Sequence, residues 1–127
     1  MPVSGLTPRS VAIVDDDPAI RLALTRLVGS LGYAPMPFET GGHLLAALGA
    51  VEPGCVVTDL QMPGLSGLDL LRQLRLRRPR LRVILVTAYP SDANRRRALA
   101  CGAFAYLAKP FEAEELERCL ARAFDTP

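Results

Sequence analysis

Five apolar segments of strand length alternate with helical patterns along the chain, and this alternation constrains the fold more than any other feature. Three segments are continuous apolar runs, VAIV (11–14), CVV (55–57) and VILV (83–86), as expected of strands covered on both faces. Strands that alternate with helices form parallel sheets through right-handed crossovers. The sequence therefore predicts a single α/β domain with a five-stranded parallel sheet and helices on both faces.

The expected strands cover residues 10–14, 33–37, 55–59, 82–87 and 103–107. Apolar residues at helical spacing lie between and after them: Ile20, Ala23, Leu24, Leu27, Val28 and Leu31; Leu68, Leu71 and Leu74; Leu116, Leu120 and Ala123. Residues 40–48 and 91–101 are expected to form two further helices.

Two prolines, Pro35 and Pro37, cannot donate to a strand ladder and place the second strand at a sheet edge. This favours the strand order 2-1-3-4-5 of a doubly wound, flavodoxin-like sheet. We expect the domain to occupy residues 10–124, with an N-terminal extension (1–9) and a C-terminal tail (125–127).

Composition and charge argue against a nucleic-acid-binding protein. Half of the 127 residues are hydrophobic, which suits one domain with one core, and the formal net charge is only +2. The arginine-rich stretch RQLRLRRPRLR (72–82) contains no aromatic residue for stacking on bases. We therefore interpret it as a solvated helix end and loop, and expect no direct nucleic-acid binding.

The cysteines and the apolar runs indicate the compartment. Cys55, Cys101 and Cys119 have unrelated spacings and apolar neighbours, which predicts buried, reduced thiols. No secretory signal pattern is visible at the N-terminus, and no apolar run is long enough to span a bilayer. These observations predict a cytoplasmic protein without a membrane partner.

Polar residues stand at the carboxyl ends of four expected strands, where ligands bind in sheets of this kind. Asp15 and Asp16 follow the first strand, Asp59 ends the third, Thr87 ends the fourth and Lys109 follows the fifth. Fourteen of the fifteen basic residues are arginine, so Lys109 is the only ammonium side chain of the chain. An arginine does not replace a lysine equivalently in phosphate chemistry.

This set of groups fits one reaction. Clustered carboxylates with water suit Mg²⁺, and a carboxylate such as Asp59 can act as a nucleophile through an aspartyl-phosphate intermediate. Lys109 can pair with phosphoryl oxygens, and Thr87 can donate a hydrogen bond to one of them. The residues therefore predict phosphorylation of Asp59.

The three carboxylates of AIVDDDP (12–18) are expected to divide between two tasks. Adjacent strand residues point to opposite faces, so Asp15 and Asp16 can face one cation only where the chain leaves the strand. Asp17 precedes Pro18, which is favoured at the first position of a helix, so Asp17 is the expected N-cap. Ser66 is likewise expected to cap a helix, and His43, without ligands at a suitable spacing, to lie on a helix surface.

Four motifs resemble the receiver domain of bacterial two-component response regulators. They are VDDD (14–17), TDLQMPGLSGLDLL (58–71), VILVTA (83–88) and CGAFAYLAKPF (101–111), in the order of that family and spread over almost the whole chain. The resemblance implies that Asp15 and Asp16 form the acidic pair of a Mg²⁺ (or Mn²⁺) site. It also implies that Asp59 is both phosphoacceptor and metal ligand, and that the backbone carbonyl of Gln61 is a further ligand.

The resemblance implies roles for the residues around this site as well. Thr87 and Lys109 would contact the phosphoryl group, and Lys109–Pro110 would be a cis peptide. Tyr106 would be the aromatic switch residue that turns inward when Thr87 moves. Gln61 and Tyr89 would tune hydrolysis of the phosphorylated state.

As a receiver, the chain would not be an enzyme beyond self-catalysed phosphoryl transfer to Asp59 and its loss. Its phosphodonor would be a histidine kinase or a phosphotransfer protein. Residues 91–124 would contact an output partner or an output domain of the same protein, and a homodimer is possible. Two alternatives stay open: a phosphate-independent interaction module, and a phosphohydrolase with an aspartyl nucleophile, which would need a carboxylate where Gln61 stands.

Overall fold

A five-stranded parallel sheet forms the centre of the protein in a computed structural model, which describes residues 9–125. The strands are β1 (Ser10–Val14), β2 (Ala34–Phe38), β3 (Cys55–Asp59), β4 (Arg82–Thr87) and β5 (Ala105–Ala108), in the order β2-β1-β3-β4-β5. This confirms the predicted fold class, the strand order and the edge position of the second strand. The proposed N-terminal extension (1–9) and tail (125–127) lie almost entirely outside the described residues.

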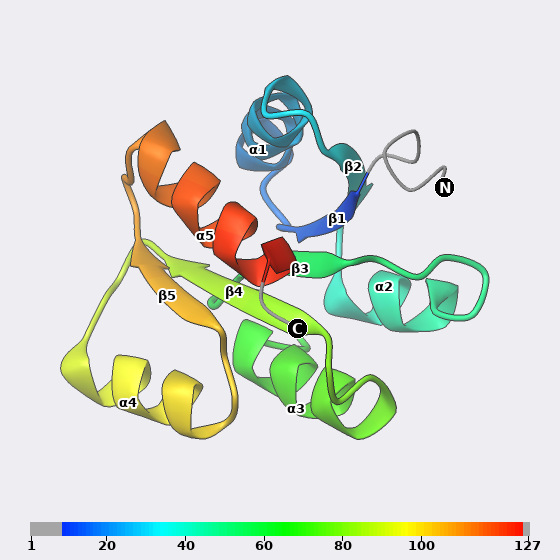
Figure 1. Cartoon of the computed structure of the whole chain (residues 1–127). Helices are drawn as coiled ribbons and strands as arrows, with labels where there is room; N and C mark the ends of the chain where they lie inside the picture. Colours follow the sequence, from blue (N-terminus) through cyan, green and yellow to red (C-terminus); the bar gives the residue numbers. More distant parts are fainter. Residues whose placement is uncertain (1–8, 126–127) are drawn as a thin grey trace.

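Helices follow every strand and cover both faces of the sheet (Figure 1). They are α1 (Pro18–Ser30), α2 (Gly41–Ala47), α3 (Gly67–Arg77), α4 (Asp92–Ala100) and α5 (Ala113–Asp125). Helices α1 and α5 pack on one face, and α2, α3 and α4 pack on the other. Within residues 9–125, none of these helices has the length and apolar character needed to cross a membrane.

Alternate residues of the central strands supply the two halves of the core. Val11 and Ile13 of β1 pack toward α1 and α5, whereas Ala12 and Val14 pack toward α2 and α3; all four are fully buried. Because both faces are covered, the strands need apolar side chains at successive positions rather than at every second one. This explains the continuous apolar runs of the sequence.

The structure corrects two expectations about burial. Ala23 was expected on the buried face of α1 but is exposed, because only part of that helix, with Leu24 and Val28, faces the sheet closely. Cys101 was expected to be buried but is half-buried at the end of α4, whereas Cys55 and Cys119 are buried as predicted. His43 is exposed on α2, as expected.

The arginine-rich stretch contacts its own domain more than a purely solvated loop would. Arg75 donates to the carbonyl oxygens of Pro79 and Leu81, which closes the turn after α3. Arg78 pairs with Glu52 through two hydrogen bonds of 2.8 and 2.7 Å, and the guanidinium of Arg82 lies 5.3 Å from the ring centre of Phe104. Arg72 also pairs with Asp69 at 3.6 Å, and Arg77 donates to Leu45 O at 3.3 Å. Five of the six arginines of this stretch therefore have intramolecular contacts.

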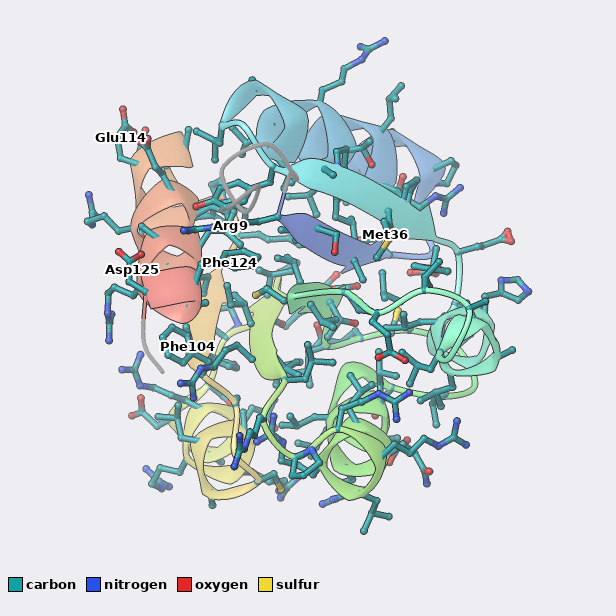
Figure 2. All side chains as sticks on the ribbon, turned by 45° about the vertical axis from the view of Figure 1, so that its right-hand side comes forward. Arg9, Met36, Phe104, Glu114, Phe124 and Asp125 are labelled. Carbon is teal, nitrogen blue, oxygen red and sulfur yellow. The ribbon has the colours of Figure 1, made fainter. Side chains whose placement is uncertain are left out.

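The end of α5 is held against the start of the sheet. Phe124 stacks on Tyr33 with 5.2 Å between ring centres. The Arg9 guanidinium lies 5.4 Å from the ring centre of Phe124, and Figure 2 labels both of these residues. Arg9 also pairs with Asp125 at 3.9 Å. These contacts anchor the last turn of α5 beside the amino-terminal ends of β1 and β2. Asp59 lies at the other end of the sheet, where the strands have their carboxyl ends.

Helix α1 begins at Pro18 because Asp17 caps it. The Asp17 carboxylate accepts from the backbone amides of Ala19 at 2.9 Å and Ile20 at 3.3 Å. Two amides that have no partner inside the helix are thereby satisfied. The predicted division of AIVDDDP is confirmed for Asp17, which serves the helix.

Asp17→Ala should lower the free energy of unfolding by about 1 kcal/mol, because two amides at the start of α1 lose their acceptor. Asp16→Ala is the matched control, since Asp16 is exposed and does not cap α1. Urea unfolding of both variants measures the difference. Equal loss of stability in the two variants would contradict the capping role.

Candidate functional site

The carboxyl ends of the strands form a continuous edge that carries the predicted polar residues. Backbone hydrogen bonds extend past the strands, from Lys109 N to Thr87 O at 2.7 Å and from Leu60 N to Val86 O at 2.8 Å. On the other side, Asp15 N donates to Phe38 O at 3.3 Å. The ends of the strands are thus held in register, and the side chains that follow them are fixed relative to one another.

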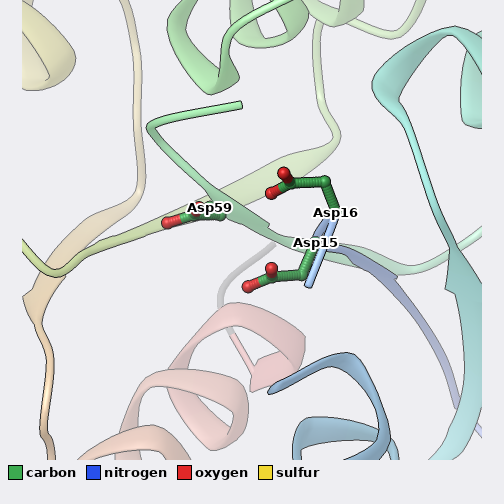
Figure 3. A group of neighbouring side chains, drawn as sticks. All are labelled: Asp15, Asp16 and Asp59. Atoms are coloured by element: carbon green, nitrogen blue, oxygen red, sulfur yellow. The ribbon is translucent and has the colours of Figure 1, made fainter. Parts of the chain in front are cut away.

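Three carboxylates converge at this edge (Figure 3). Asp15, Asp16 and Asp59 each offer an oxygen, and these atoms lie within 4.8 Å of one another. Asp15 is 1% exposed and Asp59 8%, whereas Asp16 is exposed. Oxygen ligands in a partly open pocket match the coordination that Mg²⁺ prefers, with positions left for water. The residues present therefore fit a divalent cation.

Lys109 lies between two of the carboxylates. Its Nζ is 3.2 Å from Asp15 Oδ2 and 3.3 Å from Asp59 Oδ1, and its side chain is only 16% exposed. One ammonium thus offsets part of the repulsion between two buried acids. The structure also places a cis peptide at Lys109–Pro110, as expected.

Burial raises the pKa of the Asp59 carboxyl above its ordinary value. The positive charge of Lys109 opposes this change, and the negative charges of Asp15 and Asp16 add to it. Ionised Asp59 is therefore disfavoured by its own surroundings. A divalent cation at the acidic cluster would favour the ionised form.

Asp15 is oriented by its own turn. Its Oδ1 accepts from the backbone amide of Asp17 at 2.9 Å, and its carbonyl oxygen accepts from the Arg21 guanidinium at 2.7 Å. The turn makes it possible for consecutive aspartates to face one site. The contribution of Arg21 was missed in the sequence, where one more arginine on a helix gives no signal.

Thr87 is fully buried, and its hydroxyl has two partners. Thr87 Oγ1 donates to Gln61 Oε1 at 2.6 Å and accepts from the backbone amide of Tyr89 at 3.0 Å. The side chain of Gln61 therefore contacts Thr87. The role of the Gln61 backbone carbonyl as a metal ligand stays a prediction.

The two aromatic residues occupy different surroundings. Tyr106 is half-buried, and its hydroxyl oxygen accepts from the backbone amide of Ser91 at 3.4 Å. It lines a hollow of about 210 Å³ with Pro90, Ser91, Asp92, Arg95 and Ala108. Tyr89 is 74% exposed, and its backbone amide donates to Thr87 Oγ1. Its role in hydrolysis stays a prediction.

Gly67 is a second residue that the sequence reasoning missed. A Cβ atom at this position would lie 2.3 Å from Asp59 O and 2.9 Å from the Cα of Leu60. The start of α3 therefore packs against the backbone of Asp59 at a distance that only glycine permits. Its amide donates to Leu60 O at 2.9 Å, which closes the loop after β3.

Ser66 caps α3 as predicted, and the cap is more complete than expected. Ser66 Oγ accepts from the amide of Asp69 at 3.1 Å, and the Asp69 carboxylate accepts from the amide of Ser66 at 3.3 Å. This reciprocal pair is a capping box, in which Asp69 takes the place of the usual Glu or Gln. Together with Gly67 it fixes the loop that carries Gln61.

Asp59→Asn should raise the free energy of unfolding at neutral pH in protein free of divalent cations. The folded state binds the Asp59 proton more tightly than the unfolded chain, whose pKa is about 3.9. As the pH rises through the interval between the two pKa values, the unfolded chain has released its proton first, so the stability of the wild type falls. An asparagine has no such proton.

Urea unfolding in EDTA tests this at pH 7 and at about pH 3.5, which lies below the pKa of the Asp59 carboxyl in the unfolded chain. The advantage of the variant should shrink at the lower pH, and added Mg²⁺ should stabilise the wild type more than Asp59→Asn. A variant that is less stable than the wild type by the same amount at both pH values would contradict the prediction.

Comparison with known proteins identifies the family. The family described as Response regulator receiver domain matches residues 11–121. The chain is 41% identical over 113 residues to the DNA-binding transcriptional regulator NtrC of Salmonella typhimurium, covering 89% of this chain and 24% of that protein. It is 32% identical over 117 residues to the transcriptional regulatory protein FixJ of Bradyrhizobium diazoefficiens, covering 92% of this chain and 57% of that protein.

A solved structure of a CheY-like response regulator receiver domain protein from Methanospirillum hungatei superimposes with a TM-score of 0.87 at 29% identity, covering 94% of this chain and 95% of that one. The chain thus spans about a quarter of the length of NtrC and somewhat more than half of FixJ. The sequence similarity, the fold and the carboxylates at the ends of the strands all point to the same family. The chain belongs to the receiver domains of two-component response regulators.

Proposed function

We propose that Asp59 of this receiver domain is phosphorylated in a Mg²⁺-dependent reaction, and that the phosphoryl group shifts the surface formed by residues 91–124. The observation that carries the proposal is the position of Lys109 Nζ, 3.2 Å from Asp15 and 3.3 Å from Asp59, beside three carboxylates that can hold a cation. We place the domain limits at residues 10–124.

The residues of the site have defined tasks in the proposed transfer. An oxygen of the Asp59 carboxylate attacks phosphorus, and the bond from phosphorus to the donor nitrogen of a phosphohistidine breaks as the new P–O bond forms. Asp15, Asp16, Asp59 and the backbone carbonyl of Gln61 would hold the cation, Mg²⁺ or Mn²⁺. The cation supplies charge neutralisation for the incoming phosphoryl oxygens.

Lys109 and Thr87 complete the site in this proposal. Lys109 exchanges its contact with Asp59 for one with a phosphoryl oxygen, and charge-assisted hydrogen bonds of this kind are among the stronger ones in proteins. Thr87 donates its hydroxyl proton to another phosphoryl oxygen. Gln61 and Tyr89 influence the access of water to the phosphoryl group and so its lifetime.

The response of the surface follows from the position of Tyr106. When Thr87 moves toward the phosphoryl group, the half-buried ring of Tyr106 can turn inward and leave its contact with Ser91. Helix α4 then repacks, and it is held loosely, since Ala98 is its buried residue. Phosphorylation thus shifts a balance between pre-existing conformations.

The proposed partners are those of a signalling protein. A histidine kinase or a phosphotransfer protein donates the phosphoryl group, and residues 91–124 contact an output partner, an output domain of the same protein or a second copy. Catalysis is limited to phosphoryl transfer to and from Asp59, and the setting is cytoplasmic. The exposed charge of Arg95, Arg96 and Arg97 on α4 supports a contact surface there, without direct binding of nucleic acid.

Acetyl phosphate with Mg²⁺ should add one phosphoryl group to the wild type, as measured by intact mass. The gain should disappear in Asp59→Asn and when EDTA replaces Mg²⁺, because the acceptor or the cation is then missing. Folded wild type that stays unlabelled would contradict the proposal and favour a phosphate-independent module. Turnover of a small phosphomonoester without a stable aspartyl label would instead indicate a phosphohydrolase.

Lys109→Arg should slow labelling of Asp59 by about tenfold or more, although the positive charge is kept. A hydrogen bond to a charged group contributes about 1.5–3 kcal/mol, and a planar guanidinium cannot replace a compact ammonium that touches two carboxylates. The rate of the mass gain measures the effect. Arg26→Lys, an exchange at an exposed position of α1, is the control and should label like the wild type. Equal rates for Lys109→Arg and the wild type would contradict the role of Lys109.

A further inference from the structure

The hydroxyl group of Thr87 has a single proton, and this proton is donated in a hydrogen bond to the Gln61 side chain. Thr87 Oγ1 donates to Gln61 Oε1 at 2.6 Å while it accepts from the amide of Tyr89 at 3.0 Å. Both lengths are ordinary for hydrogen bonds of their kinds. A hydroxyl donates one hydrogen bond, so Thr87 cannot donate to a phosphoryl oxygen while it donates to Gln61.

The backbone keeps these two side chains together. Asp59 of β3 pairs with Val86 of β4. Gln61 and Thr87 therefore both lie just beyond this last residue pair of two neighbouring strands. The loop that carries Gln61 is tied at its start by Leu60 N to Val86 O at 2.8 Å and closed by Gly67 N to Leu60 O at 2.9 Å. Thr87 is fully buried, whereas Gln61 is exposed. Water can therefore replace Thr87 as a partner of Gln61 when the two separate.

We propose that Gln61 is a positioning residue that holds Thr87 in its unphosphorylated conformation; we call this hydrogen bond the Gln61–Thr87 latch. The inference rests on the proposed function, in which Thr87 donates to the phosphoryl group of Asp59. Engagement of Thr87 requires the latch to open. Because the latch is one hydrogen bond between neutral groups, it biases the conformational equilibrium by a modest factor and does not prevent the change.

The latch can be opened without phosphorylation by removing the amide oxygen. Gln61→Met keeps a long unbranched side chain, but its thioether is a weak acceptor. Gln61→Ala removes the same oxygen and serves as a second variant. Gln61→Glu keeps an acceptor oxygen at a similar reach and is the matched control.

The first measurement uses protein free of phosphate and divalent cations. NMR of ¹³C-labelled threonine reports the χ1 rotamer populations of Thr87. One rotamer should dominate in the wild type and in Gln61→Glu, and a mixture should appear in Gln61→Met and Gln61→Ala. Rotamer populations in both oxygen-free variants that equal those of the wild type would overturn the latch.

The second measurement uses beryllofluoride with Mg²⁺ as the probe for a phosphoryl group on Asp59. Gln61→Met should bind it about threefold to tenfold more tightly than the wild type, the factor expected when a competing neutral hydrogen bond is lost. In a Thr87→Val background, which has no hydroxyl proton, Gln61→Met should change the affinity little. An equal gain in both backgrounds would overturn the proposal.

The two measurements separate the latch from the function on which it rests. If the wild type binds no beryllofluoride and accepts no phosphoryl group, the proposed function fails. The rotamer measurement still judges the latch in that case, because it needs neither phosphate nor a cation. A mixed rotamer population that appears only when the Gln61 oxygen is removed would support the latch.

Discussion

Mutual repulsion among three carboxylates at one edge of the sheet is the constraint on which the rest of the site depends. Asp15, Asp16 and Asp59 place oxygens within 4.8 Å, two of them on nearly buried side chains. Positive charge beside these carboxylates favours their ionised forms. Lys109 supplies part of that charge, and the carboxylate cluster is suited to hold a cation that supplies the rest. The residues of the site therefore fit a divalent cation, as the proposed function requires.

The surrounding fold holds this repulsive arrangement in place. Covered on both faces, the central strands carry buried apolar side chains at successive positions. Gly67 lets α3 approach the backbone of Asp59, and the capping box of Ser66 and Asp69 fixes the start of that helix. On the other side, Asp17 caps α1 and its amide orients Asp15. The acidic cluster thus lies at the ends of well-packed elements, and the proposed phosphoryl transfer would need such fixed positions.

The part that moves in the proposed function lies next to this rigid part. Thr87 is shared between the Gln61 side chain and, in the proposed function, the phosphoryl group, while Tyr106 lies at the boundary between the sheet and α4. Helix α4 is the most exposed of the helices near the site, with Ala98 as its buried residue. A single hydrogen bond exchanged at Thr87 can therefore influence a surface that is only weakly anchored.

Periodicity and residue type alone were enough for the strand order, the helices, the caps at Asp17 and Ser66, and the meeting of Asp15, Asp59, Thr87 and Lys109 at one edge. Parallel strands bring their carboxyl ends to the same side, so this meeting follows from topology. The exposure of Ala23, the clearance at Gly67, and the partners of Lys109 and Thr87 were decided by the tertiary structure. They depend on how the helices pack on the sheet and on the side-chain rotamers that neighbouring loops allow. Local sequence patterns do not encode distances between segments that are far apart in the chain.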